Sequence, residues 1–199
     1  LTEVTAEICA RLGVEATLLP MSDDPVRTRI TTPGGERTFQ EYLVRDGARD
    51  DITGIVMEGV EDAAPAPGLL AAIAEAERIV IAPSSPVVSI GTILAVPGVR
   101  DALAARRADC VAVTPIIGGA PVEGPAARFL AGAGYPECSA TQMARIYADV
   151  AAVFLLDSSD AAEAPAVAAL DVRPVLTDVL MPDHAARARL AAEALGALP

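Results

Sequence analysis

Apolar and polar residues alternate in blocks along the second half of the chain, and the blocks are typical of strands and helices in turn. Short β-branched and aliphatic runs predict strands that are buried on both faces, as in a parallel sheet. These strands are expected at Arg78–Ala82, Cys110–Thr114, Val153–Leu156 and Val172–Leu176. Helical periodicity occupies the segments before, between and after them, at Pro67–Glu77, Val99–Arg106, Pro125–Ala131, Thr141–Ala148, Ala161–Leu170 and Asp183–Leu195.

Connections of this length join parallel strands. The pattern therefore predicts the α/β class, with a Rossmann-like, doubly wound, mostly parallel sheet. No internal repeat or low-complexity linker interrupts it. We expect one domain over residues 1–199, with a β-hairpin-rich insertion at residues 20–60.

The first sixty residues predict a helix and a short strand, followed by the hairpin-rich insertion at residues 20–60. Val4, Ile8 and Leu12 recur every four residues before Gly13, which predicts an amphipathic helix with a glycine at its end. The segment Pro33-Gly34-Gly35-Glu36 lies between two β-rich stretches and predicts a hairpin. Strands are expected here at Ala16–Leu19, Val26–Thr32, Thr38–Val44 and Ile52–Met57.

The charge and composition of the chain argue against several classes of function. The net charge of −12, from 15 basic and 27 acidic residues, argues against a nucleic-acid partner. No apolar run approaches the ~20 residues that cross a membrane, so no membrane partner is expected. Three cysteines without paired spacing favour reduced thiols in the cytoplasm. His184 is the single histidine, which leaves little material for a histidine-rich metal site or a Ser/His/Asp triad.

In open α/β sheets, ligands bind beyond the carboxyl ends of the strands. The loop after Arg78–Ala82 carries several hydroxyls and a glycine, and free amides near a helix N-terminus would favour a phosphate. The candidate substrate-binding residues of this loop are Ser84, Ser85, Ser89 and Gly91. The alternative is a proline-rich turn in which serine caps the following helix.

The loop after Cys110–Thr114 is rich in glycine. Gly118 and Gly119 allow the backbone to approach a ligand closely, and Gly124-Pro125 begins the next helix. A plain Gly-Pro turn explains the same residues equally well. The loop is not a Walker loop, because no GK[ST] sequence follows it.

A third group of polar residues opens the hairpin-rich stretch. Asp23 and Asp24 are adjacent carboxylates in a turn and are candidate ligands of a divalent cation. Arg27 and Arg29 share one strand face, where positive charge in an acidic protein would attract an anionic substrate. A solvated hairpin edge that its charges keep soluble is the alternative.

These segments, in this order, resemble the CofD/FbiA family, the 2-phospho-L-lactate or phosphoenolpyruvate transferases of coenzyme F-420 biosynthesis. The resemblance covers nearly the whole chain. Its most specific parts are PVVSIGTILAVPGVRDAL and PIIGGAPVEGPAARFL, two long and unusual strings. The other matching stretches are LTEVTAEICARLGV, PMSDDPVRTRI, TFQEYLVR and VLTDVLM.

The resemblance implies a transfer reaction. A phospholactyl or phosphoenolpyruvyl group would pass from a guanosine diphosphate-linked donor to the deazaflavin Fo, with release of GMP and assistance from Mg²⁺. Such chemistry depends mainly on positioning and charge neutralisation. The loops at Ser84–Gly91 and Gly118–Gly119 would hold phosphates, and the Asp23–Arg29 segment would line the acceptor side. No residue is assigned as the catalytic base.

The sequence also departs from the family. The family's Gly-rich strand-loop-helix and Asp-rich metal loop do not precede Leu1, so we expect a C-terminal fragment that is inactive by itself. The surface left uncovered would allow association, and a homodimer is one such arrangement. Ser84-Ser85-Pro86 stands where the family commonly has Ser-Asn-Pro. A non-catalytic nucleotide- or sugar-nucleotide-binding regulator of the gluconeogenesis-factor-like family is the alternative function.

Overall fold

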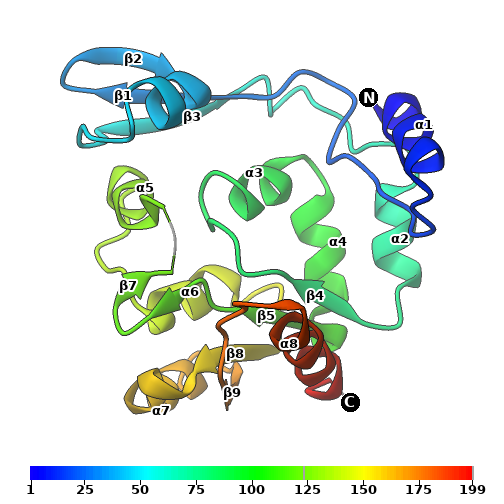
Figure 1. Ribbon diagram of the computed structural model, residues 1–199, viewed down its shortest axis with the longest axis vertical. Helices are drawn as coiled ribbons and strands as arrows, with labels where there is room; N and C mark the ends of the chain where they lie inside the picture. The colour runs from blue at the N-terminus through cyan, green and yellow to red at the C-terminus, as the bar shows by residue number, and fades with distance from the viewer. Residues whose placement is uncertain (123, 199) are drawn as a thin grey trace.

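The main body of the computed structural model is a four-stranded parallel sheet of order β4-β5-β8-β9 (Figure 1). The structure describes residues 1–122 and 124–198. The strands are β4 (Ile79–Ile81), β5 (Cys110–Val113), β8 (Val153–Asp157) and β9 (Arg173–Thr177). Parallel pairing joins each neighbouring pair, for example Val111 with Val153. The predicted α/β class with a parallel sheet is confirmed, and all four predicted strands of the second half are present.

Helices connect these strands. The helices before and between them are α2 (Leu69–Glu75), α3 (Ile90–Ala95), α4 (Val99–Ala105), η2 (Arg107–Asp109), α5 (Ala126–Gly132), α6 (Ala140–Tyr147), η3 (Ser158–Glu163) and α7 (Ala164–Ala168). The last is α8 (His184–Gly196). The predicted helix Ala161–Leu170 is therefore split, because its first part follows tighter 3₁₀ geometry in η3.

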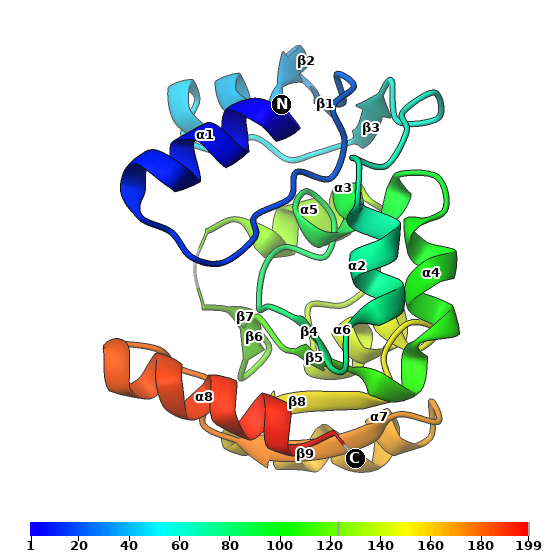
Figure 2. The same ribbon diagram turned by 90° about the vertical axis from the view of Figure 1, so that its right-hand side faces the viewer.

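The two faces of the sheet pack against different helices. Along β5, Cys110 and Ala112 point into the larger core, whereas Val111 and Val113 pack against α8. Strand order rises steadily across the sheet, so right-handed crossovers place the connecting helices on one face and leave the other to α8. Figure 2 shows α8 and α4 on opposite sides of the strands. Burial on both faces explains why the central strands β5 and β8 are continuous apolar runs. The expectation of two buried faces is wrong for the edge strands, where Val80 of β4 and Leu176 of β9 are 41% and 47% exposed.

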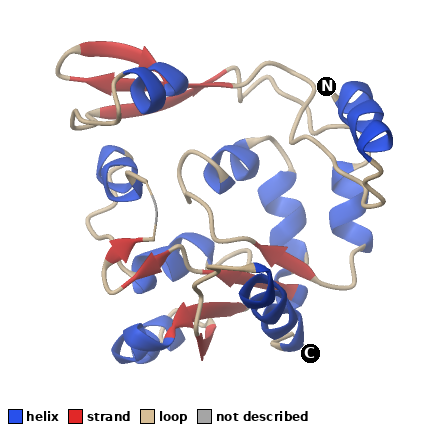
Figure 3. Ribbon diagram, viewed as in Figure 1, coloured by secondary structure: helices blue, strands red, loops and turns tan. Residues whose placement is uncertain are grey.

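A separate antiparallel sheet of order β2-β1-β3 lies beside α3 and α5 (Figure 3). Its strands are β1 (Arg27–Thr32), β2 (Gly35–Thr38) and β3 (Gly54–Glu58). The pairing of Thr32 with Gly35 leaves Pro33-Gly34 as the two-residue turn.

The predicted strand Thr38–Val44 is wrong beyond its first residue. The chain turns into a helix after Thr38 and ends in the π-helical turn η1 (Glu41–Arg45). A capping box starts this helix. The Thr38 hydroxyl accepts a hydrogen bond from the Glu41 amide at 3.2 Å, and the Glu41 carboxylate accepts one from the Thr38 amide at 2.9 Å. The signature Thr-x-x-Glu was present in the sequence and outweighs the β-rich composition.

The predicted helix near the start forms as α1 (Thr2–Leu12), and Gly13 ends it with φ of 65°. Its apolar stripe is not buried, however, with Val4, Ile8 and Leu12 exposed to 54%, 52% and 74%. The strand predicted at Ala16–Leu19 is wrong, because this segment has no regular structure.

The glycine-rich loop after β5 forms a small hairpin that the sequence did not predict, in which β6 (Ile116–Ile117) is antiparallel to β7 (Ala120–Pro121). Across the described ranges, no helix is both long and apolar enough to traverse a bilayer.

Thr38→Ala should lower the free energy of unfolding by about 1 kcal/mol, because the substitution removes the capping box that starts the helix before η1. Denaturant titration measures this loss. Gln40→Ala on the same exposed helix turn is the matched control and should change stability little. Equal losses in the two variants would show that the cap contributes nothing specific.

Candidate functional site

The main candidate site is a cavity of about 680 Å³ at the carboxyl ends of β4, β5 and β9. Parallel strands end at the same edge of a sheet, so the loops that follow them meet there. The residues after these strands that line the cavity are Pro83, Ser84, Ser85, Val88, Ser89, Thr114, Pro115, Val179, Leu180, Met181 and Pro182. Val122, Gly124, Pro125, Ala126, Phe129, Arg187, Phe39 and Leu43 complete the lining.

The serine loop divides into structural and cavity-facing hydroxyls. The Ser85 hydroxyl accepts the amides of Val88 and Val87 at 3.2 and 3.4 Å, so it caps its own turn. Ser84 and Ser89 also line the cavity. Their hydroxyls make no hydrogen bond within residues 1–122 and 124–198. Both hydroxyls are therefore available to a ligand, whereas that of Ser85 is committed to the loop.

Arg187 supplies the positive charge of the cavity. It lies in the first turns of α8 and is the single charged side chain among the described lining residues. No carboxylate of the described segments lies within ion-pair distance of its guanidinium. Many other arginines are neutralised, such as Arg100 by Asp149 at 2.7 Å. An unpaired guanidinium in a protein of net charge −12 is suited to an anionic group, above all a phosphate.

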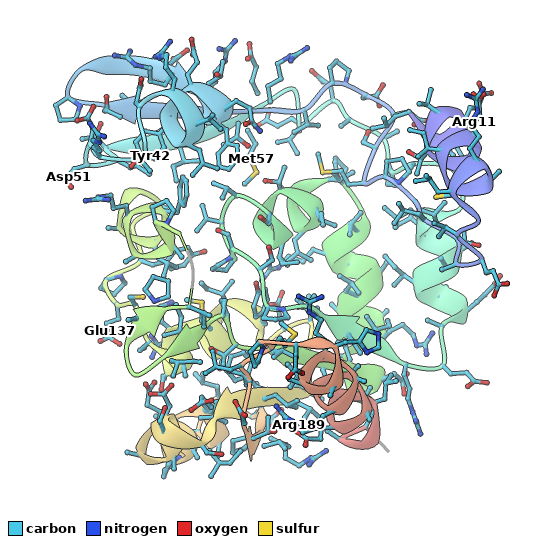
Figure 4. All side chains as sticks on the ribbon, viewed as in Figure 1. Arg11, Tyr42, Asp51, Met57, Glu137 and Arg189 are labelled. Carbon is cyan, nitrogen blue, oxygen red and sulfur yellow. The ribbon has the colours of Figure 1, made fainter. Side chains whose placement is uncertain are left out.

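Aromatic side chains form the wall farthest from the sheet. Phe39, beside η1, lies 5.8 Å from Phe129 of α5 between ring centroids, and Tyr42 lies 5.9 Å from Phe129 in an edge arrangement. Figure 4 shows Tyr42 on the side of the antiparallel unit that faces α5. Two of the three phenylalanines of the chain thus line this cavity. They offer an apolar face on which a flat ring could stack.

The candidate glycines lie outside the lining of this cavity. A side chain at Gly91 would place Cβ 2.4 Å from the Pro86 carbonyl oxygen, so this glycine is needed for close packing of α3 against its loop. Gly118 donates its amide to both carboxylate oxygens of Asp160 at 3.0 Å. Gly119 follows it in the turn between β6 and β7, with φ of 74°. The Gly118 amide is therefore already paired.

The acidic candidates also lie outside the cavity. Asp23 accepts a hydrogen bond from the Thr2 amide at 2.6 Å and one from the Thr2 hydroxyl at 2.9 Å. The hydrogen bond from the Thr2 amide is the main cause that lowers the pKa of Asp23. Asp24 accepts the Ala64 amide at 2.8 Å. Both carboxylates tie the first helix and the loops together.

These two aspartates do not fit a magnesium site. Mg²⁺ requires several oxygen ligands in octahedral geometry. Within the described ranges, no three His, Cys, Asp or Glu residues are grouped so that they could hold a metal ion.

The arginine candidates lie on the antiparallel unit, away from the cavity lining. Arg29 pairs with Glu58 on the neighbouring strand at 2.9 Å, and this hydrogen bond raises its pKa. Arg27 is exposed, and the ion pairs among the described residues do not include it. The structure thus brings Ser84, Ser85 and Ser89 together at one cavity and leaves the other candidates elsewhere.

Sequence reasoning missed the residues from Val179 to Arg187 and the aromatic wall. The signal for the first group was present, because the segment follows the fourth predicted strand and begins at the same sheet edge. No comparable signal existed for Phe39 and Leu43. Their place in the cavity depends on how the antiparallel unit sits over α5.

The model of the family described as 2-phospho-L-lactate transferase CofD matches residues 1–187 of the chain.

The chain belongs to the CofD family.

Curated CofD-family relatives match at high identity. A phosphoenolpyruvate transferase of Kitasatospora aureofaciens is 47% identical over 200 residues, which cover 98% of this chain and 62% of the relative. One from Streptomyces griseus is 44% identical, covering 98% of this chain and 63% of the relative. A 2-phospho-L-lactate transferase of Methanosarcina mazei is 39% identical over 181 residues, covering 91% and 59%. The chain thus spans 62% of the length of the first of these relatives.

A solved structure resembles the CofD-family fold seen here. It is a UPF0052 family protein of Bacillus halodurans, with a TM-score of 0.67 and 19% identity. The match covers 96% of this chain and 65% of that chain. At this identity the likeness establishes the shared fold alone.

Ser85→Ala should lower the free energy of unfolding by about 1 kcal/mol, because two amides of the turn lose their acceptor. Ser84→Ala should leave stability nearly unchanged, since the Ser84 hydroxyl has no partner among the described residues. Thermal and denaturant unfolding of the two variants compare these effects. A loss confined to Ser84→Ala would reverse the assignment of the two hydroxyls.

Proposed function

We propose that the protein is a transferase that moves a phospholactyl or phosphoenolpyruvyl group from a guanosine diphosphate-linked donor to the deazaflavin Fo, releasing GMP. The cavity carries this proposal, because it combines at one sheet edge an aromatic wall, a guanidinium without a carboxylate partner among the described residues, and two hydroxyls without a hydrogen bond to those residues. The family match and the names of the relatives support the coarser part of the proposal, a transferase that handles a phospholactyl or phosphoenolpyruvyl group. A cytoplasmic location is part of the proposal, consistent with three free cysteines.

In this proposal the cavity positions the diphosphate of the donor. Arg187 neutralises phosphate charge, and Ser84 and Ser89 donate hydrogen bonds to phosphate oxygens. Phe39 and Phe129 hold a flat ring, either the guanine or the deazaflavin, against the apolar wall. The residues of this chain therefore bind and orient the reactants.

The chemical step is a displacement at phosphorus. A hydroxyl oxygen of Fo forms a bond to the phosphorus that bears the lactyl or enolpyruvyl group, and the bond from that phosphorus to the bridging oxygen breaks. The bridging oxygen leaves with GMP and takes the electron pair of the broken bond, while the proton of the Fo hydroxyl passes to solvent. Fixed geometry and charge neutralisation supply most of the rate enhancement in such reactions. Mg²⁺ belongs to the proposal as a further source of charge neutralisation, although Asp23 and Asp24 do not fit it.

Transfer by a protein with the length of the relatives should be detected as GMP release that depends on Fo. Supplying the lactyl and the enolpyruvyl donor separately identifies the group that is transferred. We expect residues 1–199 alone to show no release, because they correspond to 62% of the length of the Kitasatospora relative. Mg²⁺-dependent release by residues 1–199 would place the whole catalytic machinery within them. Nucleotide binding without transfer by the longer protein would favour the regulator.

Arg187→Ala should weaken GDP binding about tenfold to a hundredfold, the range for loss of a charge-assisted hydrogen bond. Arg187→Lys should retain part of the affinity, because the charge remains while the planar guanidinium is lost. Arg78→Ala removes an exposed arginine remote from the cavity and is the matched control. Isothermal titration with GDP measures all three. Equal affinities for Arg187→Ala and the control would remove Arg187 from the site.

A further inference from the structure

The loop after β8 is unlike the other loops at the carboxyl edge of the sheet. Loops after β4, β5 and β9 all line the cavity, but none of the described lining residues comes from η3 or the end of β8. Yet this loop holds Asp157 and Asp160, the only buried carboxylates in the described part of the chain, at 8% and 7% exposure. Carboxylates are seldom buried unless they bind something, so their partners identify the role of the loop.

Asp157 reaches the loop after β9. Its Oδ1 accepts the amide and the hydroxyl of Ser159 at 2.9 and 2.6 Å, which caps the start of η3. Its Oδ2 accepts the amide of the buried Val179 at 3.2 Å. Val179 is the first residue of the cavity-lining segment Val179–Pro182, which leads directly into α8 and Arg187. Asp157 thus holds the wall that carries the guanidinium.

Asp160 reaches the loop after β5. Both of its oxygens accept the Gly118 amide at 3.0 Å. Gly118 lies at the tip of the hairpin formed by β6 and β7, whose register is set by the pair Ile117 and Ala120. Pro115 before this hairpin and Val122 after it both line the cavity. Asp160 thus holds the hairpin from which the second wall extends.

Neither carboxylate is neutralised by a cation among the described residues. Burial raises the pKa of Asp157, but the hydrogen bonds from Ser159 and Val179 outweigh burial and keep the pKa below its ordinary value of 3.8. Asp157 is therefore ionised at neutral pH and depends on N–H and O–H donors alone. If either wall moved away, a buried carboxylate would lose a hydrogen-bond donor, and this loss would cost free energy. The hydrogen bonds therefore favour one position for each loop.

We propose that Asp157 and Asp160 are positioning residues that hold the two walls of the cavity in the geometry that binds the nucleoside diphosphate. They touch the walls and not the ligand. The identity of the ligand rests on the proposed function, whereas the bracing of the walls does not. The loop after β8 therefore supports both walls of the cavity from outside it, although none of its residues lines the cavity.

Hydrogen exchange of individual amides tests the bracing directly. Asp157→Ala should speed exchange of the Val179 amide about tenfold or more while leaving the Gly118 amide unchanged, because only one of the two amides loses its acceptor. Asp160→Ala should have the opposite selectivity. Asp160→Asn should restore slow exchange at Gly118, since its amide oxygen can accept the same hydrogen bond. Asp157→Asn, which preserves volume, replaces Asp157→Ala if that variant does not fold.

GDP titration then tests whether the bracing serves binding. Each alanine variant should weaken GDP binding about tenfold, and Asp160→Asn should recover most of the affinity, whereas a merely structural role would leave the affinity of the folded fraction unchanged. Asp171→Asn is the matched control, because Asp171 is 96% exposed in its side chain and precedes β9 at the opposite edge. It should alter neither exchange nor affinity.

The outcomes separate this proposal from the function itself. Unchanged exchange at both amides overturns the bracing, and faster exchange with control-like GDP affinity overturns its role in binding. If the unaltered protein binds no GDP, the proposed function fails, and the exchange data alone decide whether Asp157 and Asp160 hold the walls.

Discussion

The structure depends on the burial of both faces of the two central strands of the parallel sheet, β5 and β8. Val111 and Val113 pack against α8 while Cys110 and Ala112 pack on the other side, so β5 has no solvent-facing row. Burial on two faces leaves only the strand ends available for chemistry, and parallel pairing brings the carboxyl ends to one edge. Every loop that lines the cavity from the main body follows from this arrangement.

Charge and shape at that edge have different sources. An acidic protein must present positive charge locally to hold an anion, and here Arg187 does so from the first turns of α8. The apolar wall comes from the antiparallel unit, where contact between Phe39 and Phe129 joins that unit to α5. The cavity thus lies at the junction of two substructures, with Arg187 on one of them and Phe39 of the aromatic wall on the other.

The cavity-lining residues of the main body could be predicted from the sequence, whereas those of the antiparallel unit could not. The strand-end rule located Ser84, Ser85 and Ser89, and it applied equally to the segment after β9 that contains Val179. The local capping signal Thr38-x-x-Glu41 was also present in the sequence, but β-rich composition concealed it. Gly118 was a candidate ligand-binding residue because its loop is rich in glycine. Its amide, however, already donates a hydrogen bond to the distant carboxylate of Asp160.

By itself, the sequence determined the α/β class, the four parallel strands and the serine loop, because periodicity and strand ends are local properties. Only the tertiary structure decided which hydroxyls face the cavity, that Arg187 has no carboxylate partner among the described residues, and that Asp23 and Asp24 bind backbone amides. The pairing of Asp160 with Gly118 spans 42 residues, and that of Asp157 with Val179 spans 22. Such contacts depend on how separate loops pack against one another in the folded protein, and no local sequence pattern predicts that packing.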